Sequence, residues 1–170
     1  MESIRLTPGL IKGNFTSKTN LNFLLEKNLT VDKIKVSTEV VLNKVDVPKI
    51  GLDLDLTSGN FILNADNESM TIKGTGQLSG IETKIEWHEN FVHMGKYRRK
   101  YRLKSTVDDR SWREKLKLNF PPFNKTYING VIGVDVSVKV SEDGSGELEA
   151  NLDLKDTLIT LPRMGWYKPK

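Results

Sequence analysis

Apolar and polar side chains alternate along most of this chain with a period of two residues. In the clearest segment every second residue is a valine: Val134, Val136, Val138 and Val140. Successive side chains of a β-strand point to opposite faces of its sheet, so each such segment has one dry face and one wet face. Buried parallel strands tend to be apolar without interruption, so this pattern favours antiparallel pairing.

The same alternation predicts further strands, which are separated by turn-forming clusters. The strands are expected at residues 31–42, 52–57, 61–65, 70–78, 81–87, 97–107 and 148–155. The turns are expected at residues 57–60, 66–69, 79–80, 129–130 and 142–146, which are rich in Gly, Asn, Asp and Ser. Closely spaced turns between short strands predict a meander. Gly74 and Gly76 interrupt one strand and predict a bend in it.

Helix is expected only in short pieces. Asp109 can act as an N-cap, and Trp112 and Leu116 follow at helical spacing before Pro121. Residues 20–27 fit either a second short helix or a strand. We therefore predict one mainly β domain over residues 1–170. It would be a curved antiparallel sheet, built as an open groove or a sandwich-like fold, with one or two short helices.

Composition limits how thickly that sheet can be covered. Apolar residues make up 37% of the 170 positions, below the roughly 45–50% (glycine included) of globular domains. This supply suits one dry face better than a sealed core. The chain has no Cys, which excludes disulfides, thiolate metal ligands and Cys nucleophiles. The formal net charge is only +4, which is mild for a partner of a polyanion.

No segment resembles an export signal or a membrane anchor. No apolar run approaches the ~18–20 residues of a spanning helix, and the first residues lack the charged and apolar regions of a signal peptide. If the natural protein is associated with a membrane, we expect this chain to be an excised segment of it.

Candidate catalytic and metal-binding groups are sparse. His88 and His93 lack the spacing of the helical zinc signature, and no third ligand accompanies them. The i, i+2 carboxylate pairs Asp53/Asp55 and Glu147/Glu149 fall on the wet side of their strands. No nucleophile elbow, phosphate loop or dinucleotide fingerprint is present. We therefore expect no enzyme activity, no cofactor and no metal site.

The sharpest charge feature is a basic cluster between residues 96 and 104. It comprises Lys96, Arg98, Arg99, Lys100, Arg102 and Lys104. On a strand Arg98, Lys100 and Arg102 share one face, while Arg99 lies on the other face with Tyr97 and Tyr101. Three roles stay open: a solvated face that prevents edge pairing, contact with anionic lipid head groups, or phosphate contacts with nucleic acid.

Three stretches in order resemble a known family. They are the glycine-containing strand 74–80 that leads into Trp87-His88-Glu89-Asn90-Phe91, the basic strand 98–103, and the end 161–169, which reads Leu-Pro-Arg-Met-Gly-Trp-Tyr-Lys-Pro. Their order and spacing resemble the domain of unknown function in large AsmA-like proteins of bacterial cell envelopes. The resemblance covers most of residues 30–170. It implies a bridge-like lipid transporter in which an apolar β-groove carries phospholipid acyl chains between inner and outer membranes.

The resemblance also implies partners and a location. The partners would be phospholipid, or another ligand with acyl chains, and neighbouring repeats of the same polypeptide, with no nucleic acid expected. The location would be the periplasmic part of a protein anchored in the inner membrane. Head-group candidates are Arg98, Lys100 and Arg102. Candidates for the apolar lining are Leu52, Leu54, Leu56, Phe61, Leu63, Ile72, Trp87, Val134, Val136, Val138, Leu152 and Leu154.

Two other functions stay open beside the lipid groove. A sealed β-sandwich that serves as a structural or interaction module would show the same alternation, because its dry face would simply be core. A weak nucleic-acid binder would use the basic strand between residues 96 and 104 and lose affinity steeply with salt. A hydrolase finds no support in the sequence.

Overall fold

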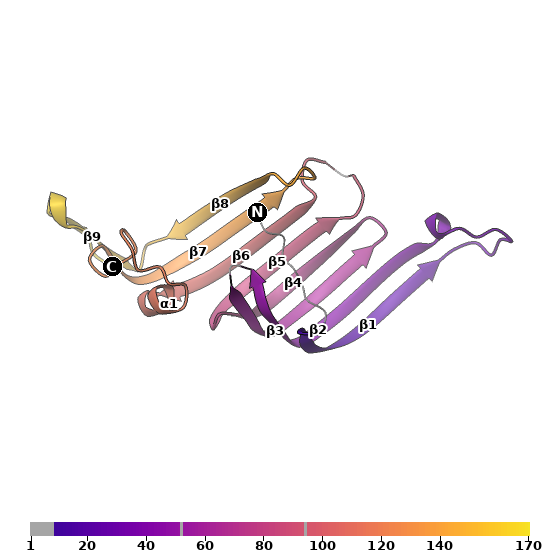
Figure 1. Ribbon diagram of the computed structural model, residues 1–170, viewed down its shortest axis with the longest axis horizontal. Coiled ribbons are helices and arrows are strands. Elements are labelled where there is room, and N and C mark those ends of the chain that lie inside the picture. Colours follow the sequence, from indigo (N-terminus) through magenta and orange to yellow (C-terminus); the bar gives the residue numbers. More distant parts are fainter. Residues whose placement is uncertain (1–8, 52, 94) are drawn as a thin grey trace.

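The computed structural model describes residues 9–51, 53–93 and 95–170, which form one continuous layer of strands. Strand accounts for 62% of the structure, in a single antiparallel sheet of 10 strands that does not close on itself. This confirms the mainly β, curved antiparallel meander predicted from the alternation. Figure 1 shows the strands lying side by side in chain order.

The elements are mainly strands, with short helices between them. They are β1 (Lys12–Asn22), the 3-10 helix η1 (Val31–Lys33), β2 (Lys35–Gly51), β3 (Leu54–Asp66), β4 (Ser69–Leu78), β5 (Ile81–Asn90), β6 (Arg99–Asp108), α1 (Asp109–Glu114), β7 (Ile128–Val140), β8 (Gly146–Asp153), β9 (Thr157–Leu161), the 3-10 helix η2 (Pro162–Met164) and β10 (Trp166–Lys168). Each strand from β1 to β7 pairs with the next, and β7 pairs along its far edge with β8 and then with β9.

The register aligns the side chains in rows that cross the sheet. One row runs through directly opposed residues from β1 to β8: Ser17, Val40, Leu63, Ile72, Trp87, Tyr101, Val138 and Leu148. The next row on the same face comprises Phe15, Leu42, Phe61, Gly74, Ile85, Leu103, Val136 and Ala150. Directly opposed residues of an antiparallel pair share a face. We call the side that carries these two rows the apolar face.

A bulge in β3 keeps its leucines on the apolar face. Leu56 pairs with Leu78, but Phe61 pairs with Gly74, and the register shifts between Thr57 and Asn60. The shift of one residue lets an even-numbered leucine and an odd-numbered phenylalanine point the same way. Residues 57–60, predicted as a turn, are therefore a bulge within a strand, because β2 and β4 pair with β3 on both sides of them.

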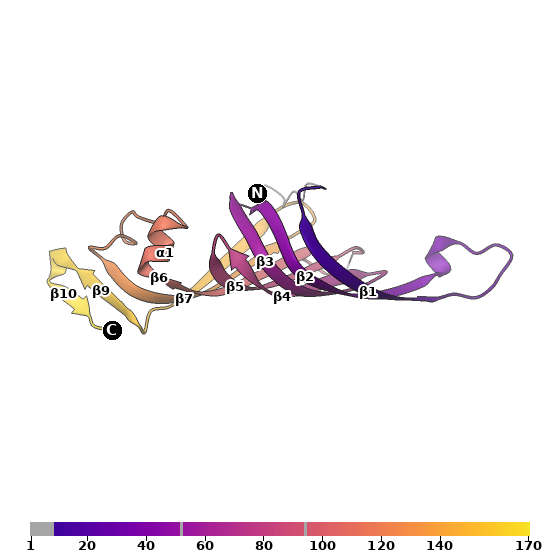
Figure 2. The same cartoon turned by 90° about the horizontal axis from the view of Figure 1, so that it is seen from below.

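Buried side chains gather in two clusters at the ends of the apolar face. Val47, Leu56 and Phe61 form one cluster where β2 and β3 curl. The other cluster comprises Ile81, Val107, Trp112, Ile128 and Ile132. Figure 2 shows the ends of β2 and β3 bending towards the side on which α1 lies. The sheet is thus curved, with α1 over one end of its apolar face.

Two local expectations differ from the structure, and one open alternative is decided by it. The N-cap of α1 is Asp108 rather than Asp109, because the Asp108 carboxylate accepts hydrogen bonds from the backbone nitrogens of Arg110 and Ser111. Asn129-Gly130 lies inside β7 and not at a turn, since β9 pairs with this part of the strand. Residues 20–27 hold no helix; β1 continues to Asn22.

Candidate functional site

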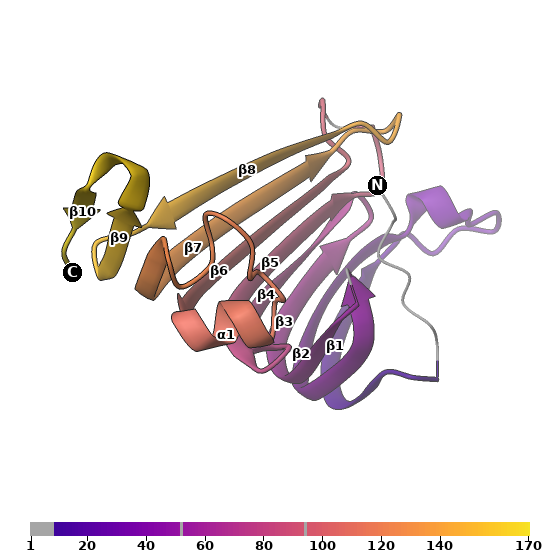
Figure 3. The ribbon, with the colours of Figure 1, turned by 60° about the vertical axis from the view of Figure 1, so that its left-hand side comes forward.

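The middle of the apolar face is only partly buried. In the row that contains Trp87 and Tyr101 no side chain is fully buried, and in the neighbouring row Phe61 alone is. At the two edges of the sheet Phe15 is 71% exposed and Leu148 is 62% exposed. In a sealed sandwich a second layer would cover these positions. Among the described residues, only α1 and the segment after it lie over this face (Figure 3).

The covered end is built on Trp112 of α1. This side chain is buried against Ile81, Val107 and Ile132, and its indole Nε1 donates a hydrogen bond of 2.9 Å to the carbonyl oxygen of Phe123. That bond ties the segment that follows α1 onto the helix. Leu116, Leu118, Phe123 and Tyr127 then pack around the same cluster. The apolar face therefore has an end wall over the ends of β6 and β7.

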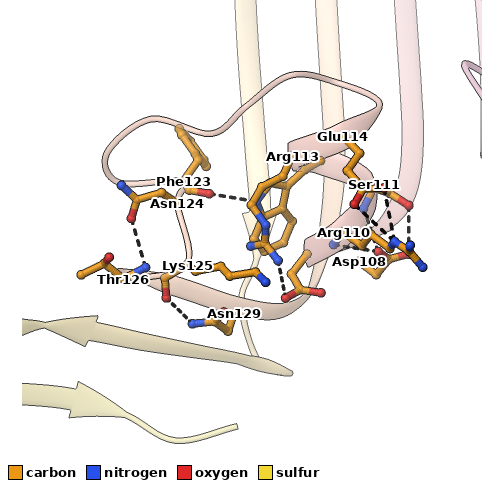
Figure 4. Close-up of polar contacts among 12 residues, drawn as sticks. Asp108, Arg110, Ser111, Arg113, Glu114, Phe123, Asn124, Lys125, Thr126 and Asn129 are labelled. Carbon is orange, nitrogen blue, oxygen red and sulfur yellow. Dashed lines mark hydrogen bonds and ion pairs between the residues drawn. The ribbon is translucent and has the colours of Figure 1, made fainter.

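Polar contacts fix the orientation of α1. Asp108 Oδ1 accepts from the backbone nitrogens of Arg110 (3.0 Å) and Ser111 (2.8 Å), as Figure 4 shows. The bond from Ser111 is the main reason that the pKa of Asp108 lies below its ordinary value. Arg113 Nη2 donates to Asp109 Oδ2 at 2.6 Å, and its guanidinium lies 5.6 Å from the Trp112 ring. These contacts hold the indole over the sheet.

A charged pair interrupts the apolar face beside the aromatic row. Glu89 on β5 and Arg99 on β6 are directly opposed, and Arg99 Nε donates to Glu89 Oε1 at 2.9 Å. Arg98 approaches the same oxygen at 3.6 Å. The Glu89 side chain is only 11% exposed, whereas Arg99 is 29% exposed and Arg98 is 50% exposed. Burial raises the pKa of the neighbouring Tyr101. The positive charge of Arg99 partly offsets this rise, and the negative charge of Glu89 adds to it.

On the opposite, polar face three residues of the basic cluster form ion pairs. Asp135 accepts from Arg102 at 2.8 Å and lies 3.0 Å from Lys104. Hydrogen bonds from these two cations lower the pKa of Asp135 far below its ordinary value. Lys96 contacts Glu147 at 2.7 Å in the same way. Five of the six basic residues between 96 and 104 therefore contact a carboxylate, although only three carboxylates, those of Glu89, Asp135 and Glu147, are shared among them.

Two shallow hollows lie on the polar face, with volumes of about 530 and 790 Å³. The smaller one is lined by charged groups of both signs, among them Lys73, Glu86, Lys100 and Glu149. His88 lines it too, and its ring nitrogens contact Thr71 and Asn90. Across residues 9–51, 53–93 and 95–170 no group of three or more His, Asp or Glu side chains could hold a metal ion.

The structure brings most of the predicted apolar lining onto one face. Leu63, Ile72, Trp87, Val136 and Val138 lie in the two rows described above. Val134 and Leu152 oppose each other on the same face. Phe61 lies in the second of these rows, and it is buried with Leu56 at the end of the same face where β2 and β3 curl. Leu54 is partly buried at the start of β3, Leu154 packs against the cluster that contains Trp112, and Leu52 lies outside the described residues.

The head-group candidates are divided between two faces. Lys100 and Arg102 point to the polar face, where Arg102 is bound to Asp135. Arg98 contacts Glu89, which lies on the apolar face. Four residues of the apolar face were not among the predicted site residues: Val40, Leu42, Arg99 and Tyr101. The alternation along residues 36–42 and 97–103 had nevertheless assigned each of them a face.

Comparisons with known proteins add no relative. No protein-family model, no curated protein and no solved structure matches this chain. Within the part of the chain that the structure describes, no helix is long and apolar enough to cross a membrane.

Proposed function

We propose that this chain binds the acyl chains of phospholipid on its apolar face and performs no catalysis. In this proposal it is one segment of a longer lipid-conducting β-groove. The observation that carries it is the uncovered middle of the apolar face, where two rows of apolar side chains cross eight strands with almost no side chain fully buried. Contiguous apolar side chains that no second layer covers are typical of binding surfaces.

The energetics of acyl-chain burial suit such a surface. Each methylene removed from water contributes roughly 0.8 kcal/mol, with no requirement for directional contacts. Partly buried aliphatic side chains such as Leu63, Ile72 and Val138 offer that kind of contact. Trp87 and Tyr101 add broad rings in the same row. The sheet needs no polar group in its middle to hold a hydrocarbon chain.

Both edges of the sheet support a place in a longer groove. Every residue of β1 and of β8 is exposed, and among the described residues each of these strands pairs on one side only. A free strand edge is a template for another strand. The motif order that resembles AsmA-like envelope proteins supports the same setting, in which the groove would lie in the periplasm and neighbouring repeats would extend it.

A lipid-retention assay on the purified chain tests the proposal. The chain is incubated with phosphatidylcholine vesicles that carry an acyl-labelled fluorescent phosphatidylcholine, and protein-bound fluorescence is measured after the vesicles are removed. We expect retention by the unaltered chain. A folded sample that retains no labelled lipid would contradict the proposal.

The chain offers a matched pair of variants for this assay. Leu63 and Ile62 are consecutive residues of β3, and their side chains lie on opposite faces. A lysine at residue 63 places a charge in the apolar row, which must be desolvated when an acyl chain binds. We expect Leu63→Lys to lower retention about tenfold and Ile62→Lys to leave it unchanged. Equal effects of the two variants would show that the assay does not report on the apolar face.

The free edges also favour a second candidate function, that of an interaction module that pairs with another strand. This candidate predicts association of the chain without lipid uptake. Retention of lipid by a monomeric sample decides against it. Nucleic-acid binding has no comparable support, because five of the six basic residues between 96 and 104 contact carboxylates of the chain itself.

A further inference from the structure

A charged cluster of Arg98, Arg99 and Glu89 lies at the apolar face and plays no part in the binding of acyl chains proposed above. Glu89 and Arg99 lie in the row next to that of Trp87 and Tyr101, flanked by Met70 and Val140. Charged side chains on a dry face are costly unless they are paired. Two arginines here share one carboxylate, since Arg98 and Arg99 both approach Glu89 Oε1. The cluster therefore carries a net charge of about +1 (two guanidinium groups against one carboxylate).

The cluster has spare hydrogen-bond donors on a partly exposed side chain, that of Arg99, which is 29% exposed. Arg99 uses its Nε for Glu89, and no hydrogen bond joins its two terminal nitrogens to another described residue. Guanidinium groups bind phosphate oxygens through such paired terminal donors. The flanking side chains of this row, Met70 and Val140, bring no competing charge. An anion next to Arg99 would thus complete a charge balance that the protein leaves open.

A second unsatisfied donor lies in the adjacent row. Trp87 Nε1 is buried and has no hydrogen-bond partner among the described residues. A buried N–H without an acceptor costs free energy. The ring of Trp87 lies 5.6 Å from that of Tyr101, beside the arginine cluster. An ester carbonyl oxygen of a glycerophospholipid sits close to its phosphate, and with a tilt of the indole it would supply the missing acceptor.

We propose that Arg99 and Arg98 form a head-group site for an anionic glycerophospholipid whose acyl chains lie along the apolar face. This inference rests on the proposed lipid-binding function and deepens it, because it specifies the charge of the lipid. It assigns the head-group contact to the two arginines beside Glu89 and not to Lys100 or Arg102, which lie on the other face. Arg99 is the specificity-determining residue of this site.

The test compares two lipids that differ only in the head group. Acyl-labelled fluorescent phosphatidylglycerol and phosphatidylcholine with the same chains are offered in otherwise identical phosphatidylcholine vesicles at low salt. Protein-bound fluorescence then gives a retention ratio of phosphatidylglycerol to phosphatidylcholine. One cationic group near a lipid surface favours an anionic lipid by a factor of about five. We expect a ratio of about five for the unaltered chain.

Two variants should move this ratio in opposite directions, which loss of folding would not do. Arg99→Gln neutralises the site, and we expect its ratio to fall to about one while phosphatidylcholine is still retained. Glu89→Gln leaves both arginines without a carboxylate, and we expect its ratio to rise by a further factor of about five. Arg102→Gln is the matched control from the same strand and the opposite face, and its ratio should stay at that of the unaltered chain.

The outcomes separate this inference from the function on which it rests. Retention of neither lipid overturns both proposals. Equal retention of the two lipids by the unaltered chain overturns the head-group site and leaves the acyl-chain proposal standing. A ratio that falls as much in Arg102→Gln as in Arg99→Gln also overturns it, since the preference would then follow overall charge. If Arg99→Gln fails to fold, a ratio unchanged in Glu89→Gln overturns the inference.

Discussion

Trp87 on β5 and Tyr101 on β6 are directly opposed, with ring centroids 5.6 Å apart and an interplanar angle of 35°. They are the only two aromatic side chains in the middle row of the apolar face. Tilted aromatic pairs at this separation contribute packing beyond the area that they bury. Because neither ring is fully buried, the pair can report on what occupies the face beside it.

The fluorescence of Trp87 should respond to a bound acyl chain. A phosphatidylcholine brominated on its acyl chains quenches tryptophan on contact, and Trp87 lies in the proposed path of the chain. Trp112 is only 3% exposed beneath α1, and Trp166 is 49% exposed on β10. We expect quenching that is mostly lost in Trp87→Phe and kept in Trp166→Phe. Full quenching in Trp87→Phe would place the lipid elsewhere.

The stability of the fold should depend strongly on Trp112. Its indole fills the cluster of Ile81, Val107 and Ile132 and donates to Phe123. Removal of a buried aromatic side chain costs about 3–5 kcal/mol, so Trp112→Ala should lower the free energy of unfolding by that amount. Urea unfolding followed by circular dichroism measures it. Trp166→Ala, at an exposed position, should cost less than half as much, and similar costs would contradict this account of the core.

Gly74 is needed for the close approach of β3. A Cβ at this position would collide with the carbonyl oxygen of Asn60 and the ring of Phe61. We expect Gly74→Ala to destabilise the chain by about 1–3 kcal/mol, the usual range for overpacking. Gly144 lies in open space, although its φ of +83° disfavours other residues. Gly144→Ala should therefore cost about 1 kcal/mol, from backbone strain alone. Urea unfolding of both variants compares the two effects.

The cap of α1 should depend on an acceptor at residue 108. Asp108→Ala removes the oxygen that binds the backbone nitrogens of Arg110 and Ser111. A lost N-cap costs about 1 kcal/mol, and hydrogen exchange in α1 should become faster. Asp108→Asn keeps an acceptor and should stay close to the unaltered chain. Faster exchange in both variants alike would show that the negative charge, and not the cap geometry, matters.

The ion pairs of Asp135 should make part of the stability dependent on acid. Hydrogen bonds from Arg102 and Lys104 hold the pKa of Asp135 in the folded chain well below its ordinary value of 3.8. A carboxyl whose pKa is lowered by folding stabilises the fold above its unfolded pKa, and that contribution is lost as the pH falls towards the folded pKa. Asp135→Asn should therefore lower the urea midpoint at pH 7.

The same variant supplies the control at low pH. Below about pH 4 the difference between Asp135→Asn and the unaltered chain should shrink steadily, because the unfolded chain then binds a proton at Asp135 before the folded chain does. The effect is modest, since these side chains are solvent-exposed and screened. A difference that stays constant from pH 7 to pH 2 would contradict the assigned ion pairs.

Alternation was enough to predict the sheet and its dry face, because a period of two directly encodes which side of a strand is buried. Val136 and Val138 illustrate this, since both lie where the pattern placed them. The bulge between Thr57 and Asn60 was predicted as a turn because its Ser-Gly composition is the same for both structures. Only pairing with β2 and β4 decides between a turn and a bulge, and these partners lie far away in the sequence.

The pairing of charges could not be read from one strand. Arg98, Arg99 and Arg102 looked like parts of one basic cluster. Their partners Glu89 and Asp135 lie on β5 and β7, and the register between strands decides which carboxylate each arginine meets. The alternation did place Arg99 on the side of Tyr101. Alternation along β6 could not predict that Glu89 lies opposite Arg99. The pair of these two residues makes this end of β6 a charged site within an apolar surface.

The even number of strands between the two free edges determines how copies of this sheet can pair with one another. From β1 to β8 there are eight strands, each antiparallel to the next, so the two free edges run in opposite directions. If a second copy of the sheet is placed beside β8 in the same orientation, its β1 is antiparallel to β8. The apolar faces of the two copies then lie on the same side. The second copy is displaced by eight interstrand spacings, roughly 38 Å. An even number of strands therefore lets one copy pair with the next in the antiparallel sense of the sheet itself, with the apolar faces of both copies on one side.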